Sequence, residues 1–330
     1  MDEERSAGDA GFVGIYLPEG CRAMIALQRG VIARQQALET GLGPNSIETL
    51  LRTGRWQRVQ RGVYVAFTGP PSREALLEAA LLRAGPDAVL SHRTAAEILG
   101  LTGSHHDGPV HVTVPKNTHR AQIRGVVIHR TERAVASRDP YAFPPCTRIE
   151  DTVLDLAGSS RTADEAYGWV YRAAGKWLIS PGQLREAVLQ RTRMRWRPEL
   201  LRALEAADDG VRSNLEYRYV RDVERPHRLP RATRQARVIR YGKPCYLDNL
   251  YEDYLVCVEL DGIEAHPRDE RWRDFRRDNA GAADGIVTLR YGWSDVTQSP
   301  CGVAGQVAAV LQKRGWAGPV RRCGPSCGLR

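Results

Sequence analysis

The chain has 330 residues, of which 42% are hydrophobic and 26% are charged, as in an ordinary globular protein. This length exceeds one hydrophobic core, so we expect two or three domains, and no stretch approaches the roughly 20 apolar residues of a membrane span, which excludes a membrane protein. The acidic start MDEERSAGDAGF lacks the features of a signal peptide and favours a cytoplasmic location. The net charge of +9 indicates an acidic partner such as double-stranded DNA.

The N-terminal part of the sequence predicts a helix, a turn, a second helix and two short strands. Residues 22–40 have a helical pattern that glycines and a proline end, and Asn45 or Ser46 is placed to cap a second helix over 46–54. The segment WQRVQRGVYVAF then alternates like two strands around an Arg-Gly turn. We therefore predict a winged-helix module over residues 22–70.

A basic edge without acidic residues runs through the second half of this module. It consists of Arg52, Arg55, Arg58 and Arg61, interleaved with the aromatic residues Trp56 and Tyr64. In a winged helix the second helix enters the major groove and the wing contacts the backbone, so we expect these arginines to bind phosphates. Side chains near the helix start would reach bases, and the candidates are Asn45, Ser46 and Thr49. A solvated basic turn is the alternative that the residues alone leave open.

Residues 25–101 resemble the N-terminal and adjoining regions of AbiEi-like type IV antitoxins. The resemblance is carried by the segments GVIARQQALETG, LLRTGRWQRVQRGVYV and LSHRTAAEILGL. It implies DNA binding, autoregulation and a cognate toxin as a second partner.

Residues 71–210 predict a mixed hairpin and helical connector. Two helices are expected within 72–101, a hairpin of two alternating strands over 109–131, and further helices over 147–207. Six histidines of this region suggest a metal site, but we reject it because His111 and His129 lie on paired strands whose polar positions alternate outward, and His105 and His106 lie in a Gly-rich turn. The six histidines are His92, His105, His106, His111, His119 and His129.

Residues 211–316 predict an α/β domain with the element order αβββαβ and a further helix at its end. A helix over 213–223 precedes three extended runs, and a helix over 269–283 precedes the last strand. For residues 317–330 we predict a flexible tail. Cys323 and Cys327 lie four apart there, but a zinc site needs about four ligands and the sequence shows no second nearby pair.

Acidic residues on two neighbouring strands of this domain suggest metal chemistry. Asp248 lies within one strand, and Glu259 and Asp261 end the next strand, so antiparallel pairing would bring carboxylates close together. Such groups repel unless a cation or proton neutralises them, which predicts Mg²⁺ or Mn²⁺ held by Asp248 and Glu259. Glu216 on the preceding helix is a candidate third acid, and His266 a candidate proton carrier.

Residues 211–314 resemble the very-short-patch-repair endonuclease group of the PD-(D/E)XK superfamily. VELDG followed by His266, then RDFRRDNA and GIVTLRYGWSDV, carry the resemblance. It implies a restriction-endonuclease-like fold, the catalytic set Glu216, Asp248, Glu259 and His266, and a phosphate-facing Arg277. Asp261 stands where the superfamily has a lysine, although the very-short-patch group itself uses histidine instead.

Two functions from different classes follow from these observations. The first is a DNA-binding protein whose metal-dependent endonuclease domain hydrolyses DNA phosphodiesters. The alternative is a non-enzymatic antitoxin or transcriptional repressor of a type IV toxin-antitoxin system, in which the nuclease fold is degenerate. Asp261 in place of the motif lysine favours the alternative.

Overall fold

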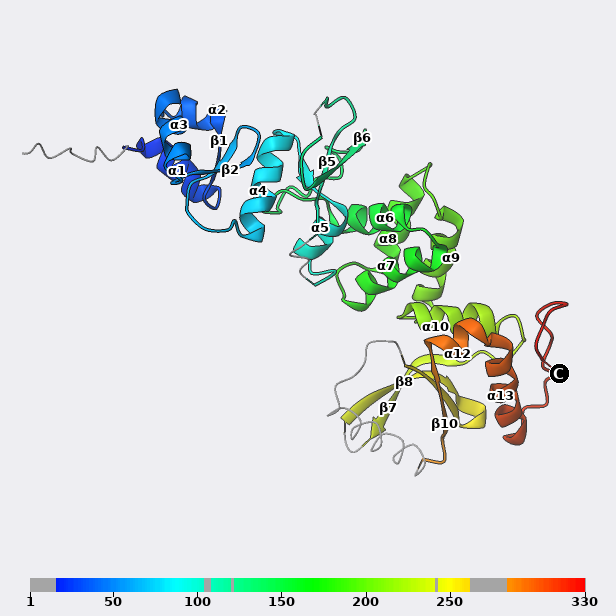
Figure 1. The fold of residues 1–330 in the computed structure, drawn as a ribbon. Helices are drawn as coiled ribbons and strands as arrows, with labels where there is room; N and C mark the ends of the chain where they lie inside the picture. The colour runs from blue at the N-terminus through cyan, green and yellow to red at the C-terminus, as the bar shows by residue number, and fades with distance from the viewer. Residues whose placement is uncertain (1–15, 104–107, 120–121, 241–242, 262–283, 330) are drawn as a thin grey trace, which may run out of the picture. The chain divides into compact units, whose positions relative to one another are not determined.

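The computed structural model describes residues 16–103, 108–119, 122–240, 243–261 and 284–329. The chain divides once, into the compact units Met1–Thr152 and Val153–Arg330, and each is described by itself (Figure 1). No helix within the described ranges is long and apolar enough to cross a membrane.

The first unit begins with a helix-turn-helix and a three-stranded antiparallel sheet. Its elements are α1 (Glu19–Leu27), β1 (Val31–Ala33), α2 (Arg34–Glu39), α3 (Pro44–Arg52), β2 (Gln57–Gln60) and β3 (Val63–Val65). The strand order is β1-β3-β2, and β2 and β3 form the hairpin expected for a wing. The winged-helix order predicted from the sequence is therefore present.

Two local predictions in this region are wrong. The single helix over 22–40 is interrupted by β1, because Arg29 and Gly30 adopt positive φ angles and end α1. The second helix begins earlier than predicted, with Gly43 at its N-cap and Pro44 in its first turn, so neither Asn45 nor Ser46 caps it.

The rest of the first unit contains a second small sheet. Its elements are α4 (Arg73–Ala84), β4 (Val89–Leu90), α5 (His92–Ile98), β5 (Val110–Pro115) and β6 (Val126–Thr131). The sheet order is β4-β5-β6, and β5 pairs with β6 in parallel. The predicted hairpin is thus wrong, because alternating polarity identifies strands but not their direction, and the segment between them is long enough to return the chain to the same end.

The second unit starts as a helical bundle. The helix α6 (Ile149–Ser159) leads into it, and the bundle continues with α7 (Ala163–Gly175), α8 (Pro181–Gln190) and α9 (Arg197–Asp208). Thr162 and Ser180 cap α7 and α8 with their side chains, as helix N-termini require.

A four-stranded mixed sheet with helices completes this unit. Its elements are α10 (Asn214–Arg218), the π-helix η1 (Tyr219–Glu224), β7 (Thr233–Arg240), β8 (Lys243–Tyr251), the short 3-10 helix η2 (Glu252–Tyr254), β9 (Val256–Asp261), β10 (Val287–Gly292), α12 (Trp293–Gln298) and α13 (Pro300–Lys313). The order is β10-β9-β8-β7, with β9 parallel to β10 and the other pairs antiparallel. The predicted helix over 269–283 lies outside the described residues.

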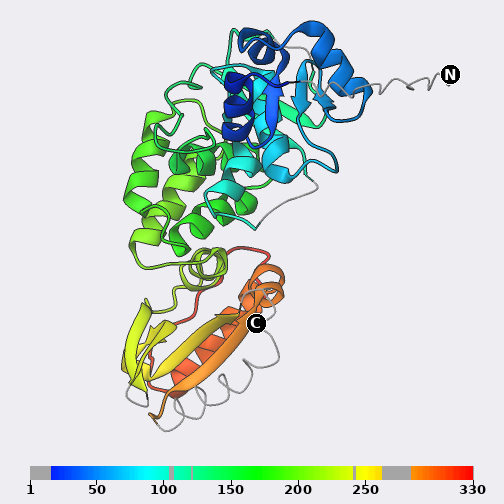
Figure 2. The same cartoon turned by 90° about the vertical axis from the view of Figure 1, so that its left-hand side faces the viewer.

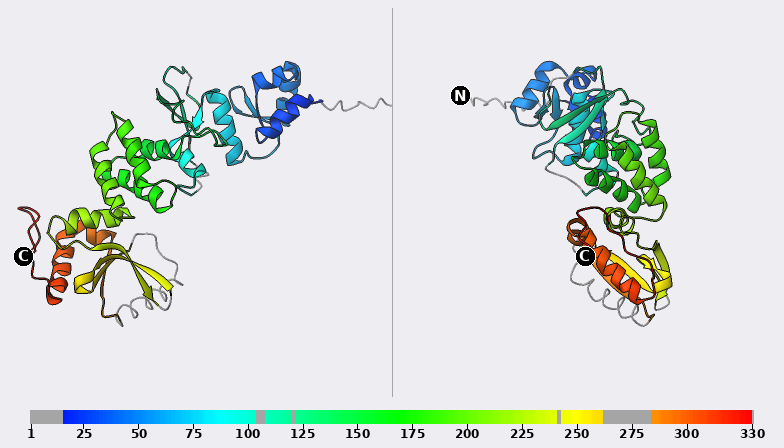
Figure 3. Two further views of the ribbon diagram at one scale, coloured as in Figure 1. Left: turned by 180° about the vertical axis from the view of Figure 1, so that it is seen from behind. Right: turned by 90° about the vertical axis from the view of Figure 1, so that its right-hand side faces the viewer.

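The helix α13 covers one face of this sheet (Figures 2 and 3). Its apolar residues Val303, Val307 and Leu311 share a core with Val256 and Val258 of β9. The alternate residues of β9 must therefore point to the opposite face, which is the face of Glu259.

The C-terminal segment, predicted as a flexible tail, is packed against the domain. Val320 lies on the core under α13, the amide of Arg321 donates to the carbonyl of His227 at 2.9 Å, and Cys327 is only 5% exposed. The prediction was wrong because the contact partners of this segment lie up to 100 residues away in the sequence.

Candidate functional site

The arginines of the predicted basic edge are all exposed on one part of the winged helix. Arg52 lies in the last turn of α3, Arg55 between α3 and β2, Arg58 on β2, and Arg61 at the turn between β2 and β3. Both the second helix and the wing thus carry cations, which is the distribution that contacts to DNA phosphates require.

The side chains predicted to reach bases lie in the first half of α3. Asn45 is exposed, Ser46 and Thr49 are half-buried, and the Thr49 hydroxyl donates to the Asn45 carbonyl at 2.9 Å. The interleaved Trp56 and Tyr64 have a different role, since each is only 2% exposed and their ring centroids lie 5.9 Å apart in the core. These aromatic residues support the module and do not belong to its surface.

In the second unit, polar side chains from four strands form one row across the sheet. Asp248 and Glu259 each lie one residue beyond the paired residues Asn249 and Val258 of β8 and β9. On the neighbouring strand β10, Arg290 is the residue paired with Glu259 in the strand register. On the neighbouring strand β7, the side-chain amide of Gln235 donates to the Asp248 Oδ1 at 3.2 Å. The predicted antiparallel pairing of the two strands, β8 and β9, is confirmed.

Hydrogen bonds connect this row to Glu216 on α10. The Gln235 amide lies 3.5 Å from the Glu216 Oε2, so one side chain bridges Glu216 and Asp248. The backbone amide of Arg212 donates to the same Glu216 oxygen at 3.0 Å, and that of Leu260 donates to the Asp248 Oδ2 at 3.0 Å. Gln235 itself has a positive φ of 48°, a costly conformation that tends to occur at functional sites.

All three acids have raised pKa values, chiefly because burial disfavours their charged forms. Burial raises the pKa of Glu216 to about 7, and the nearby Asp248 raises it further against the hydrogen bond from Arg212. The pKa values of Asp248 and Glu259 are also raised by burial, and Asp248 adds to the effect on Glu259. A group of acids held this way favours a bound cation or a retained proton.

The remaining predicted residues of this site are only partly described. Asp261, at the position of the motif lysine, is exposed and pairs with Arg290, whose Nη1 lies 3.4 Å from the Asp261 Oδ2. His266 and Arg277 lie outside the described residues. The sequence did not single out Gln235 or Arg290, since only the register of β7 and β10 places them in the row.

Two compact sets of metal-ligand side chains occur among the described residues, and neither contains the carboxylates. Their donor atoms all lie within 4.8 Å of one another. One set is His92, His111 and His129, and the other is His227, Cys301, Cys323 and Cys327.

The three histidines lie close together, although the sequence alone led us to reject a metal site among them. The rings of His92 and His129 stack with centroids 3.5 Å apart, and the His111 Nδ1 lies 3.0 Å from the His129 Nε2. Burial and the neighbouring His111 together lower the pKa of His129 to about 4, and burial also lowers the pKa of His111.

Comparisons with known proteins bear on the first unit. A search of the curated proteins finds no match. Among solved structures, the RV2827C protein from Mycobacterium tuberculosis is 18% identical with a TM-score of 0.38, over 55% of this chain and 75% of that one. A family model described as "Transcriptional regulator, AbiEi antitoxin" matches residues 23–66, the segment that forms the helix-turn-helix and wing. Residues 23–66 are therefore similar to AbiEi-type transcriptional regulators.

Proposed function

We propose that the protein is a DNA-binding transcriptional regulator of the antitoxin type, with a cognate toxin as its second partner. The observation that carries this proposal is the match of residues 23–66 to the AbiEi regulator family, on a winged helix whose exposed arginines lie on α3 and the wing. Phosphate binding by these arginines supplies affinity, and Asn45, Ser46 and Thr49 supply base contacts.

The test is DNA binding as a function of salt, measured by fluorescence anisotropy with duplex DNA from the protein's own promoter. Replacing Arg52, Arg55, Arg58 and Arg61 together by glutamine should weaken binding and reduce the salt slope by roughly 3 to 4 units, at about 0.9 per phosphate contact. The matched control replaces four exposed arginines of the second unit, namely Arg172, Arg185, Arg193 and Arg202. Equal slopes in the two quadruple variants would contradict the proposal.

A second candidate function is metal-dependent hydrolysis of DNA phosphodiesters. It is favoured by the three acids Glu216, Asp248 and Glu259 of the second unit, which we call the acid row. Its donor set consists of carboxylate oxygens, which fit the hard cations Mg²⁺ and Mn²⁺. Asp248 and Glu259 would hold the ion, and water and substrate phosphate would complete its shell. Bound there, the ion would polarise the phosphate and lower the pKa of a water molecule.

Other residues of the chain would hold the carboxylates in place and balance their charge. Gln235 fixes the side chains of Glu216 and Asp248 by its bridging amide. Arg290 lies opposite Glu259 and forms an ion pair with Asp261, the residue at the position of the motif lysine. It would therefore supply a cation near the site. His266 as proton carrier and Arg277 as phosphate ligand remain parts of this proposal.

Millimolar Mn²⁺ or Mg²⁺ should raise the melting temperature of the full chain, because an ion that binds only the folded acid row stabilises it by mass action. Asp248→Asn should abolish this shift and any DNA cleavage, and the exposed Asp253→Asn on η2 serves as control. An unchanged melting temperature together with intact nicked, mismatched and paired duplexes would leave the regulator as the sole function.

A further inference from the structure

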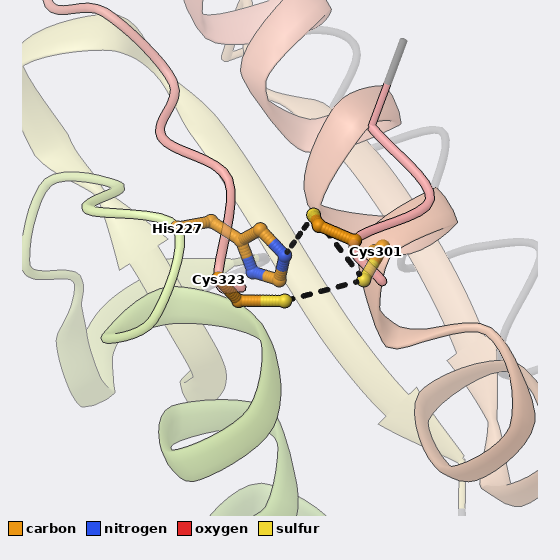
Figure 4. Close-up of side chains that lie close together, drawn as sticks. His227, Cys301 and Cys323 are labelled. Atoms are coloured by element: carbon orange, nitrogen blue, oxygen red, sulfur yellow. Dashed lines mark hydrogen bonds between the residues drawn. The ribbon is translucent and has the colours of Figure 1, made fainter. Parts of the chain in front are cut away.

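One histidine and three cysteines from three separate segments converge in the second unit (Figure 4). His227 follows η1, Cys301 lies in the first turn of α13, and Cys323 and Cys327 belong to the C-terminal segment CGPSC. None of them has a role in DNA binding or in the acid row. Their spacing along the chain spans 100 residues, so only the folded domain unites them.

Three separations between the donor atoms match those of a tetrahedral site, and all four atoms lie within 4.8 Å of one another. The Cys301 Sγ lies 3.6 Å from the Sγ atoms of both Cys323 and Cys327, and the Cys327 Sγ lies 3.7 Å from the His227 Nε2 (Figure 4). Ligands held at zinc's usual bond lengths of about 2.3 Å to sulfur and about 2.0 Å to nitrogen are separated by about 3.5 to 3.8 Å at tetrahedral angles. The four side chains therefore already surround a space of the right size.

The imidazole of His227 is oriented for ligation. It is fully buried, and its Nδ1 lies 2.8 Å from the carbonyl oxygen of Val223, which fixes the proton on Nδ1. This arrangement leaves the lone pair of Nε2 directed at the cysteines. A hydrogen bond from the second ring nitrogen to a backbone carbonyl is the usual support of a metal-bound histidine.

We propose that His227, Cys301, Cys323 and Cys327 bind one structural zinc ion that fastens the C-terminal segment to the domain. Three thiolates and one imidazole fill all four positions of a tetrahedral ion, so no place remains for substrate or water. On binding, the three thiols lose their protons to solvent and form the Zn–S bonds. The Cys-x3-Cys spacing of Cys323 and Cys327 lies within the range of zinc knuckles.

A disulfide among these cysteines is the competing arrangement. It requires a sulfur separation of about 2.05 Å, well below the 3.6 Å found between Cys301 and either partner. A disulfide would also pair only two of the three thiols and leave the lone pair of the buried His227 Nε2 without a strong donor or a metal.

The decisive measurement is the metal content of the full chain, purified under reducing conditions from medium that contains zinc. Mass spectrometry of the dissolved metal should give about one zinc ion per chain, as a single four-ligand site requires. After zinc is replaced by Co²⁺, the protein should show the intense visible bands of a tetrahedral cobalt ion with thiolate ligands. Removing zinc with a chelator should lower the melting temperature and expose the C-terminal segment to carboxypeptidase.

Substitutions test whether these four residues bind zinc or only support the fold. Cys323 is exposed, so Cys323→Ser should fold and yet lose stoichiometric zinc and the cobalt spectrum, and Cys327→Ser should behave alike. Cys245→Ser, on β8 and outside the cluster, is the matched control and should keep both. A wild-type chain that takes up neither zinc nor Co²⁺, or that shows a Cys301 disulfide in place of free thiols, would overturn the proposal.

Discussion

Single buried charges determine much of the behaviour expected of the second unit. Glu216 is 5% exposed and shares one amide with Asp248, and Glu224 is 4% exposed and pairs with Arg234. The two glutamates differ in what offsets their burial. Glu224 has a cation at 2.5 Å, whereas the hydrogen-bond donors to Glu216 among the described residues are neutral. Their substitutions should therefore act in opposite directions.

Glu216→Gln should stabilise the metal-free protein at alkaline pH. The carboxyl titrates near its ordinary value of 4.5 in the unfolded chain but near 7 in the folded protein, so the folded state holds the proton more tightly. Its contribution to stability is fully present below pH 4.5 and is lost as the pH rises to about 7. At pH 8 the substitution should recover up to about 3 kcal/mol.

Urea unfolding in the presence of a chelator, followed from pH 4 to pH 8, measures this effect. The exposed Glu186→Gln on α8 is the control and should leave the pH profile unchanged. If Glu216→Gln also leaves the profile unchanged, the carboxyl is ionised and solvated in the folded protein, and the acid row is open to water.

Arg234→Met should destabilise the second unit by about 3 to 5 kcal/mol, because it leaves the buried Glu224 without its cation. The double variant Glu224→Gln with Arg234→Met should recover part of this loss in urea unfolding. Lys116→Met breaks the exposed pair with Glu132 and should change the unfolding free energy very little. A cost of Arg234→Met no larger than that of Lys116→Met would show that Glu224 is protonated in the folded state.

At the scale of elements, the winged helix depends on how α1 ends. Gly30 has a φ of +85°, its carbonyl accepts the amide of Ala66 at 2.8 Å, and a Cβ there would meet the Phe67 ring at 2.7 Å. This turn starts β1, the strand that joins α1 to the wing through β3. Position 30 therefore combines a backbone requirement for glycine with a steric one.

Gly30→Ala should cost more stability than Gly54→Ala. Both positions have positive φ, which costs an alanine roughly 1 to 2 kcal/mol, but a Cβ at Gly54 meets nothing within 4 Å. Thermal unfolding of the two variants gives the comparison. Equal losses in the two variants would mean that the Phe67 ring moves aside at no cost.

At the scale of the whole molecule, the helical bundle of the second unit packs against the mixed-sheet part of the same unit. Tyr217 of α10 is 3% exposed, and its ring lies 4.7 Å from that of Tyr167 on α7. Arg218 forms an ion pair with Asp164, and the Asn214 side chain donates to the Asp164 carbonyl at 3.1 Å. The division predicted near residue 210 thus crosses a packed interface, in agreement with a compact unit that begins at Val153.

A fragment of residues 211–330 should therefore be less stable than one of residues 153–330. The shorter fragment exposes Tyr217 and breaks the pair of Arg218 with Asp164, so both its urea midpoint and its unfolding free energy should fall. Equal unfolding curves for the two fragments would show that the sheet domain is independent of the bundle.

The sequence by itself determined most helices and strands, and it identified the basic group on the winged helix and the acidic group on the mixed sheet. Periodicity predicted α3, the wing and the strands of the mixed sheet, because this pattern depends on neighbours a few positions away. The antiparallel pairing of the strands that carry Asp248 and Glu259 followed from one short turn between them. The arginines on α3 and the wing were visible for the same reason, since they are close in sequence.

Only the tertiary structure decided which distant residues meet. The parallel pairing of β5 with β6, the row from Gln235 to Arg290, and the convergence of His227 with three cysteines depend on strand direction, register and long-range packing. None of these has a local signature, because the free energy that selects them comes from burying whole faces of helices and sheets. The C-terminal segment illustrates the difference, since its two cysteines alone were too few for a zinc site and predicted a flexible tail, whereas the fold brings Cys301 and His227 beside them.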